Sequence, residues 1–336
     1  MAVAARDVDS MIELLADRAV PQEQSRFKVL ARRFARHRLA VICLGMLLII
    51  FLVSLFAKEI APYGPTEIDV GNTFASPFSR TEDGAKAHLL GTDHLGRDYF
   101  SRLLYAARIS LTVAFSVVAG SITIGAIVGA VSGFYGGVLD DALMRVVEFL
   151  LTIPTLPILL ILSSILIQTP EAIPVPQALI NLAGKVMYIS PRESQQVIMI
   201  IIVLMSFSWL SAARLMRGMV LSIKHMDYVE ASRALGVSNS SIILRHMIPN
   251  SMAPMIVAAS LGLADIIITE AALSFIGFGI QDPTPTWGNM LSFTQSHMFN
   301  HPWLPLVPGT PIFICALAFN FVGDGLRDAL DPRLKL

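Results

Sequence analysis

Three carboxylate side chains stand inside long apolar stretches of this sequence: Glu148, Asp265 and Glu270. An ionisable group in the middle of a bilayer is costly and is usually retained for a reason. These groups could line a polar path or contact the ammonium group of a substrate. They could instead pair with a neighbouring helix or an ordered water at a subunit interface. No nucleophile or base accompanies them, so none is interpreted as a catalytic acid.

The cysteines and histidines give little indication of metal chemistry. Cys43 and Cys315 fall inside apolar stretches, where a thiol usually fills space as a small apolar group, so we expect neither a disulfide nor a metal site. An i, i+4 histidine pair would suit a metal only if its segment were helical. We therefore expect solvated polar side chains at the four histidines His88, His94, His297 and His301.

The sequence lacks a G-x-x-x-x-G-K-[ST] phosphate-binding loop. Gly184-Lys185 is followed by Val186, and Leu179 stands where that motif has its first glycine. The chain therefore cannot bind and hydrolyse ATP by this chemistry, and any ATP-driven process would need a partner that does so.

Composition indicates an integral membrane protein, because 54% of the residues are hydrophobic and only 15% are charged, against about 25% in soluble domains. Crossing a bilayer as a helix takes roughly 20 apolar residues. The sequence predicts an all-α protein with six such spans, at residues 39–56, 110–135, 146–167, 197–220, 252–280 and 304–322.

Basic residues predict the orientation of these spans, because cytoplasmic loops carry an excess of Lys and Arg. A basic arm precedes the first span, and the segment between the fourth and fifth spans is also basic, whereas residues 281–302 contain no Lys or Arg. We expect the arm, the fourth-to-fifth segment and both termini in the cytoplasm. Three arginines of the first outer loop depart from this bias: Arg97, Arg102 and Arg108. Within the arm, one face is apolar, which favours an interfacial helix, with a partly disordered basic tail as the alternative.

The segment between the fourth and fifth spans is polar and helix-forming. Asp227 is placed to cap a short helix, with Glu230 three residues later completing a capping box. Gly236 tolerates the left-handed conformation that ends a helix. A second helix is predicted from Ser238 or Asn239 to Met247, closed by Pro249.

The string EASRALG followed by IPN resembles the EAA motif of permease subunits of bacterial ABC importers. In that family the motif forms a coupling helix that seats in a groove of a cytoplasmic ATPase. The resemblance implies ATPase contacts for Asp227, Tyr228, Glu230, Ala231, Arg233, Ala234, Leu235 and Gly236.

A second string, HLLGTDHLGRDYFSRLLYAARISL, resembles the signature that precedes the second span in the dipeptide/oligopeptide branch of that family. Its glycines are turn formers, and Asp93 and Asp98 are candidate caps. We expect a compact element that shapes the entrance and the binding-protein contact, formed by Gly91, Thr92, Asp93, Gly96, Arg97 and Asp98. The sequence departs from the branch at Ala106, where glycine is usual, and in a longer outer insert at residues 168–196.

The resemblance implies a type I ABC importer permease fold in the bacterial inner membrane. Its organisation would be a cytoplasmic basic arm at 1–38, a first span at 39–56, an extracytoplasmic loop at 57–109 and a permease core at 110–336 with its coupling loop at 221–250. The implied partners are a second homologous permease subunit, two cytoplasmic ATPase subunits that bind ATP and Mg, and an extracytoplasmic solute-binding protein that delivers di- or oligopeptides. Membrane lipid surrounds such a chain, and neither a cofactor of its own nor nucleic acid is implied.

Two other function classes remain open from the residues themselves. A secondary transporter or channel would act alone, but it would usually show two related halves with broken helices, and no convincing internal repeat is present. A membrane scaffold would anchor cytoplasmic proteins and transport nothing. Neither alternative explains the helical segment between the fourth and fifth spans.

Overall fold

The computed structural model describes residues 26–80, 87–169 and 173–330, and it is built almost entirely from helices. The first 25 residues of the predicted basic arm and the six residues of the C-terminal tail lie outside the described residues. The helices that precede the segment between the predicted fourth and fifth spans are α2 (Arg26–Phe34), α3 (Arg38–Leu55), α4 (Ala57–Ile60), α5 (Tyr99–Tyr135), α6 (Gly137–Thr152), α7 (Thr155–Gln168), α8 (Gln177–Met187) and α9 (Pro191–Ile223).

The remaining elements include short helices and one small hairpin. Helices of the second half are α10 (Asp227–Ala234), α11 (Asn239–Ile242), the π-helical turn η2 (Ile243–Met247), α12 (Ile248–Asn250), α13 (Met252–Ile276), α14 (Trp287–Phe293), the 3-10 turn η3 (Thr294–Ser296) and α15 (Leu306–Leu330). The loop between α4 and α5 carries a 3-10 turn, η1 (Val70–Asn72), and strands β1 (Ser79–Arg80) and β2 (Ala87–His88), which pair antiparallel.

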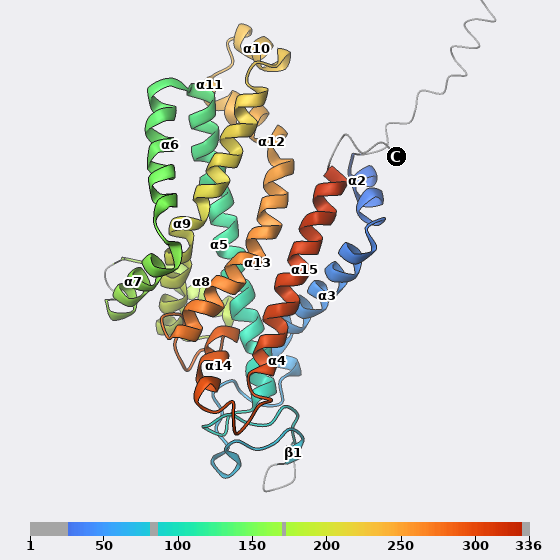
Figure 1. Cartoon of the computed structure of the whole chain (residues 1–336), viewed down its shortest axis with the longest axis vertical. Helices are drawn as coiled ribbons and strands as arrows, with labels where there is room; N and C mark the ends of the chain where they lie inside the picture. The colour runs from blue at the N-terminus through green and yellow to red at the C-terminus, as the bar shows by residue number, and fades with distance from the viewer. Residues whose placement is uncertain (1–25, 81–86, 170–172, 331–336) are drawn as a thin grey trace, which may run out of the picture.

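Long helices run between two distinct ends of the molecule (Figure 1). At one end lie α10, α2 and the last turns of α15, and at the other lie α14 and β1. We call these the α10 end and the α14 end. The predicted basic arm and the predicted coupling segment therefore occur at the same end, as the charge pattern requires.

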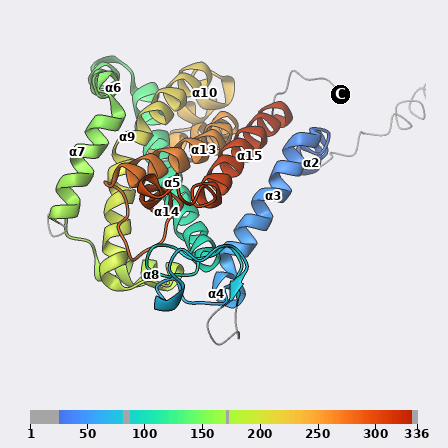
Figure 2. The same cartoon turned by 60° about the horizontal axis from the view of Figure 1, so that its bottom comes forward.

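Five helices are long and apolar enough to cross a membrane: α3, α5, α9, α13 and α15. Helices α6 and α7 pass the same test only together, and they are bent by 89° at their junction. The predicted third span at residues 146–167 thus falls on this bent pair of helices and not on one straight helix. Ile153 is extended at the break (φ −77°, ψ 130°) because the following Pro154 disfavours helical backbone before it. Figure 2 shows this bent pair to one side of α9.

Helix α5 begins well before the predicted start of the second span at residue 110. The Asp98 side chain caps it by accepting the Ser101 N–H, and the helix then continues for 37 residues to Tyr135. The predicted boundary between outer loop and core at residue 109 thus falls inside one continuous helix. The Asp98 cap therefore starts the helix within the predicted outer loop, before the predicted span.

Close packing of α5 against α9 forms the centre of the bundle. A side chain at Gly129 would drive its Cβ atom into the Ala213 carbonyl oxygen, so only glycine permits this approach of the two helices. Near the α10 end, Asp140 of α6 accepts two hydrogen bonds from the Arg217 guanidinium, both at 2.6 Å. The three helices α5, α6 and α9 are therefore tied together beside the predicted coupling segment.

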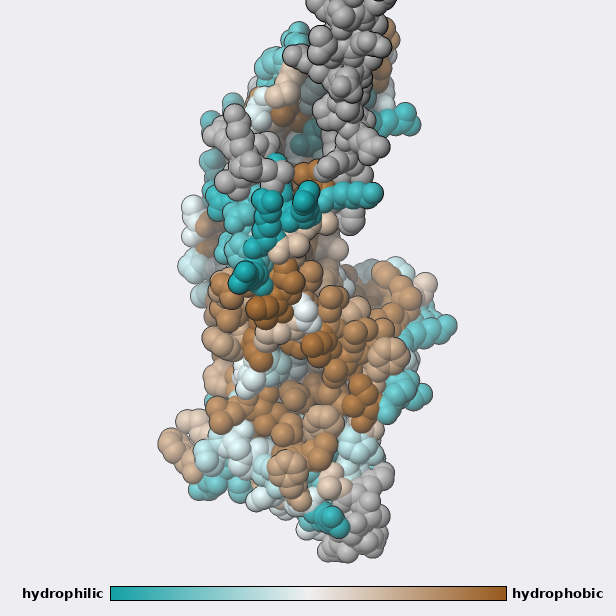
Figure 3. Space-filling model, turned by 90° about the vertical axis from the view of Figure 1, so that its right-hand side faces the viewer, coloured by the Kyte–Doolittle hydropathy of each residue, from teal (hydrophilic) through white to brown (hydrophobic). Residues whose placement is uncertain are grey.

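An apolar band separates hydrophilic regions at the two ends of the molecule (Figure 3). On α3, the exposed side chains are large and apolar, including Leu39, Ile42 and Ile49. Such a surface has the character of one that faces lipid, since soluble proteins rarely expose a contiguous apolar area of this kind. The described part of the N-terminal arm is helical, and Phe34 of α2 packs against α15 at Gly325.

The outer insert at residues 168–196 contains a helix of its own in its described part. Helix α8 packs against the core through Ile180 and Met187, which are buried. The ring of Tyr188, which follows α8, lies 4.0 Å from the guanidinium carbon of Arg108. The insert is therefore integrated with the start of α5.

Candidate functional site

The predicted coupling segment presents its motif residues to solvent. All eight residues predicted to contact an ATPase are exposed: Asp227, Tyr228, Glu230, Ala231, Arg233, Ala234, Leu235 and Gly236. Leu235 has 83% of its surface exposed, which is unusual for a leucine in a helix-terminal position beside a packed core. The segment therefore forms a small protruding surface that the described residues of the chain leave uncovered.

One residue that sequence reasoning missed holds α10 in place. Val229 is fully buried and packs into an apolar cluster with Phe134 of α5, Val220 of α9 and Met247 of η2. The Arg233 guanidinium carbon also lies 4.9 Å from the centre of the Phe134 ring. These contacts attach α10 to the ends of α5 and α9. An apolar residue within a polar helix was the available sequence signal.

Backbone groups rather than the predicted capping box begin α10. Met226 is the capping residue, no side chain caps the helix, and Asp227 is already its first residue. The predicted Asp227–Glu230 box is therefore wrong, because Asp227 lies inside the helix and its side chain cannot reach the free N–H groups of the first turn. Asp227 and Glu230 still place negative charge near the positive end of the helix dipole.

Gly236 ends α10 as predicted, with φ 76°. Its N–H donates to the Arg233 carbonyl at 3.0 Å, and the Val237 N–H donates to the Ser232 carbonyl at 3.1 Å. This pair of bonds is the Schellman motif. The second helix starts at Asn239, as predicted, but it passes Pro249 and ends at Asn250. Pro249 lies in the first turn of α12, directly after the π-helical turn η2, where the Ile248 N–H donates to the Ile243 carbonyl.

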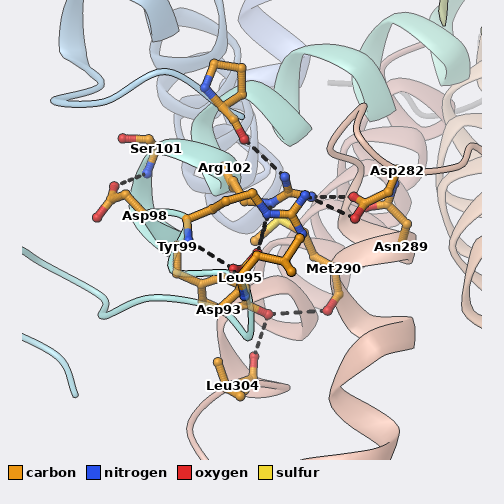
Figure 4. Close-up of polar contacts among 12 residues, drawn as sticks. Asp93, Leu95, Asp98, Tyr99, Ser101, Arg102, Asp282, Asn289, Met290 and Leu304 are labelled. Carbon is orange, nitrogen blue, oxygen red and sulfur yellow. Dashed lines mark hydrogen bonds and ion pairs between the residues drawn. The ribbon is translucent and has the colours of Figure 1, made fainter. Parts of the chain in front are cut away.

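At the α14 end, charged side chains connect the start of α5 to the loop after α13 (Figure 4). The Asp93 carboxylate accepts from Arg97 Nε at 2.6 Å and from the N–H groups of Leu95 and Arg97. Arg97 and Arg102 in turn donate to Asp282, at 3.0 and 2.8 Å. Asp93 and both arginines are buried, and the half-exposed Asp282 closes this charge network at its edge. The network holds the two segments together because an unpaired buried charge is expensive.

This network accounts for two of the three arginines that depart from the charge bias. Arg97 and Arg102 are buried and neutralised within the chain. Arg108, the third, stacks on Tyr188 and donates to the carbonyls of Leu55 and Val186. Sequence reasoning did not identify Arg102 and Asp282 as partners, because 180 residues separate them and no local pattern connects them.

All six residues of the predicted extracytoplasmic element are buried: Gly91, Thr92, Asp93, Gly96, Arg97 and Asp98. Gly91 and Gly96 have φ values of 72° and 81°, and a Cβ atom at either would collide with backbone of the preceding loop. The Thr92 hydroxyl accepts the Ala75 N–H and donates to the Asn72 carbonyl. The element is compact, as predicted, but these residues support the surface from beneath and do not form it.

Electrostatics stabilise the ionised carboxylates of this end. Burial pushes the pKa of Asp282 upward, but the guanidiniums of Arg102 and Arg97 outweigh it and hold that pKa below its usual value. The pKa of Asp69 is lowered by a hydrogen bond from Asn72, against the opposing effect of burial, with further help from His88. Both groups therefore remain charged under ordinary conditions.

The expectation of solvated histidines is wrong for His88. It is buried, its Nδ1 atom lies 2.9 Å from an Asp98 carboxylate oxygen, and its ring stacks on Tyr63. His94 is half-buried, and burial lowers its pKa. The helical condition for a metal pair is not met, because His297 follows η3 and His301 lies beyond a turn.

A cavity of about 430 Å³ lies among α5, α6, α7, α9 and α13. Its walls are mostly apolar, with the hydroxyl groups of Ser121, Thr155, Ser208, Ser211 and Thr269. Asp265 is the only charged residue among the described residues that line it. Of the three predicted path carboxylates, this one alone reaches the cavity.

The two other carboxylates occupy different environments. Glu270 is buried, accepts a hydrogen bond from the Ser274 hydroxyl at 2.8 Å and lies near Ser110 of α5. Glu148 is exposed on α6 and does not line the cavity. Glu270 thus matches the alternative of pairing with neighbouring helices. Cys43 and Cys315 are both buried free thiols.

Comparison with known proteins identifies the chain's relatives. The profile of the N-terminal transmembrane domain of oligopeptide transport permease C matches residues 25–77. The dipeptide transport system permease protein DppC of Haemophilus influenzae is 37% identical over 90% of this chain and 93% of its own length. The oligopeptide transport system permease protein OppC of Bacillus subtilis is 33% identical over 95% and 94%. The glutathione transport system permease protein GsiD of Pectobacterium atrosepticum is 36% identical over 90% of both chains.

The family of binding-protein-dependent transport system inner membrane components matches residues 121–336, which include the predicted coupling segment, the cavity-lining residues other than Val118, and helix α14. This extent and the relatives' full-length similarity make the chain a multi-pass transport subunit and not an enzyme. The chain belongs to the family of inner membrane components of binding-protein-dependent transport systems.

Proposed function

We propose that this chain is one permease subunit of an ATP-driven importer of di- or oligopeptides in a bacterial inner membrane. A second, homologous permease subunit would complete the path, two cytoplasmic ATPase subunits would bind ATP and Mg, and an extracytoplasmic binding protein would deliver substrate. The α10 end then faces the cytoplasm together with both termini. The relatives named for dipeptide and oligopeptide transport support the substrate class.

This proposal rests on two features of α10: its motif residues are exposed, and the helix itself is attached to the ends of two spans. Eight motif residues lie uncovered, while Val229 and Arg233 fix the helix to the ends of α5 and α9. Closure of the ATPases would push on the exposed surface, and the buried contacts would pass this displacement to the spans. A packed interface with two arrangements would then alternate between inward-open and outward-open states.

At the opposite end, the charge network would position a docking surface for the binding protein. The side chains available for contact include Leu95, whose N–H binds Asp93, with 41% of its surface exposed, and Phe299, in the turn after η3, with 88%. This refines the expectation from the sequence, in which the motif residues themselves made that contact.

Reconstitution of the complete system tests the proposal. The chain is expressed with its partner subunits, purified and placed in liposomes that contain ATP, and uptake of a radiolabelled dipeptide is measured with and without the binding protein. We expect copurification of the ATPases and uptake that requires both ATP and the binding protein. Uptake by the chain alone would indicate a secondary transporter or channel. ATP-driven uptake of another substrate, with no uptake of peptides, would overturn the peptide assignment only.

A further inference from the structure

Asp265 stands midway along α13, within a helix that is otherwise apolar around it. Its side chain is exposed and lines the 430 Å³ cavity. Within the described residues, no ion pair or side-chain hydrogen bond involves its carboxylate; only its backbone carbonyl accepts a bond, from the Thr269 hydroxyl. A carboxylate in this position without a cationic partner is costly and calls for a partner from outside the chain.

Glu270 and Asp140 show what a structural role looks like for a carboxylate in this molecule. Glu270 is buried and accepts from Ser274, and Asp140 is paired with Arg217. Asp265 has neither arrangement, although hydroxyl-bearing residues line the same cavity. The cavity therefore has an open volume, weakly polar walls and one negative charge, that of Asp265, among its described residues.

We propose that Asp265 is a transit site for the α-ammonium group of a peptide. This proposal rests on the proposed function and assigns the part of the substrate that the cavity recognises. The ammonium group would donate to the Asp265 carboxylate, while the apolar walls contributed by α5, α9 and α13 contact side chains without selecting among them. One charged contact with broad apolar surroundings suits substrates that share an amino terminus and differ in their side chains.

The cavity also predicts which peptides the chain would transport faster. A charge-assisted hydrogen bond to a carboxylate contributes about tenfold or more in affinity. A blocked amino terminus would lose that contact and leave the carboxylate unpaired. The chain would therefore move peptides with a free amino terminus faster than formylated ones, independently of any selection by the binding protein.

The test compares uptake of a dipeptide with uptake of its N-formyl form by the complete transporter in liposomes. Each peptide is supplied at a concentration shown by fluorescence titration to saturate the binding protein, so that the binding protein's own preference does not set the rate. The variants are Asp265→Asn, Asp265→Glu and the control Glu148→Gln, which removes an exposed carboxylate from α6 outside the cavity. Copurification of all partner subunits is measured for each variant.

We expect the unmodified transporter and the Glu148→Gln control to prefer the free dipeptide by about tenfold. Asp265→Asn should abolish this preference while retaining the partner subunits, and Asp265→Glu should keep most of it. Equal preference in Asp265→Asn and the unmodified protein would overturn the proposal. The proposal would also be overturned if Asp265→Asn lost its partner subunits and its uptake rate fell equally for both peptides. That result would mean that Asp265 pairs with the second permease subunit. If the unmodified transporter moves neither peptide but moves another substrate, the peptide function itself fails.

Discussion

Each end of this molecule carries a sequence motif, but the two motifs are used in opposite ways. At the α10 end, the eight motif residues are exposed, and the residue that secures the helix, Val229, was not part of the motif's predicted contacts. At the α14 end, all six motif residues are buried, and the exposed residues are their neighbours. A recurrent motif therefore identifies either a contact surface or the framework beneath one, and burial distinguishes the two.

This contrast has a physical basis in how each end is stabilised. At the α14 end, buried charged side chains bind one another in a specific geometry. This hydrogen-bonded network makes the element rigid. At the α10 end, apolar side chains attach one short helix to the span ends, and its polar face remains free for another protein. Substitutions at the α14 end should therefore affect stability first, and substitutions on the α10 surface should affect transport first.

The largest effect is expected from Asp93→Ala. This change leaves Arg97 without its shortest ion pair and two backbone N–H groups without an acceptor, so it should lower the free energy of unfolding by about 3 to 5 kcal/mol. Thermal unfolding of the purified complex, followed by tryptophan fluorescence, measures the loss. The exposed neighbour provides the control, since Leu95→Ala should unfold at nearly the unmodified temperature. Equal stability of the two variants would mean that the network does not support this end.

The next effect separates the buried and exposed sides of α10. Val229→Ala removes two methyl groups from a fully buried position and should cost about 2 kcal/mol. Leu235→Ala, at a position that is 83% exposed, should change stability by less than about 0.5 kcal/mol yet weaken retention of the ATPases. Unfolding temperature and copurification are measured on the same samples. A stable Val229→Ala variant with normal transport would remove the basis for the attachment we describe.

A smaller effect is expected at the end of α10. Gly236 has φ 76°, and a Cβ atom there would meet no neighbouring atom within 4 Å, so Gly236→Ala carries only a conformational cost of about 1 kcal/mol. Gly218 lies inside α9 and is equally free of neighbours. Gly218→Ala should therefore stabilise the protein by up to about 1 kcal/mol, because alanine favours a helix. The two substitutions should shift the unfolding temperature in opposite directions; shifts of the same sign would contradict this account of the turn.

The smallest effect concerns pH at the α14 end. Burial lowers the pKa of His94 in the folded protein, so the unfolded chain binds more protons than the folded chain between the two pKa values. Stability should consequently fall as pH decreases below about 6.5, the usual histidine pKa, until the lowered folded-state pKa is passed. Unfolding temperatures between pH 5 and 8 measure this slope, and His94→Gln should reduce it. An unchanged slope in that variant would assign the pH dependence to other groups.

Much of the architecture could be predicted because it depends on local patterns. Apolar length predicted six spans, of which five are single long helices and one falls on the bent pair α6–α7. The spacing of Asp98 to the apolar period predicted the cap of α5, and Gly236 predicted the end of α10. The break between α6 and α7 was not predicted, because the apolar residues on both sides of Pro154 obscured its effect.

The parts that could not be predicted depend on contacts between distant segments. Nothing near Arg102 in the sequence indicates that Asp282 neutralises it, and nothing near His88 indicates burial beside Asp69 and Asp98. The acid that reaches the cavity could not be separated from Glu148 and Glu270, because hydropathy places all three in apolar stretches without showing which way they face. These distinctions require the packing of the helices.

The most direct test of the contrast between the two ends is uptake per inserted chain for Glu230→Lys. Glu230 is exposed and makes no cap, so reversing its charge should leave membrane abundance unchanged. We expect ATP-driven dipeptide uptake and ATPase retention to be lost, whereas Asp93→Ala should lower membrane abundance while the chains that remain folded keep their ATPases. Glu230→Lys protein that is present at normal abundance and transports at the unmodified rate would contradict the assignment of α10 as the coupling surface.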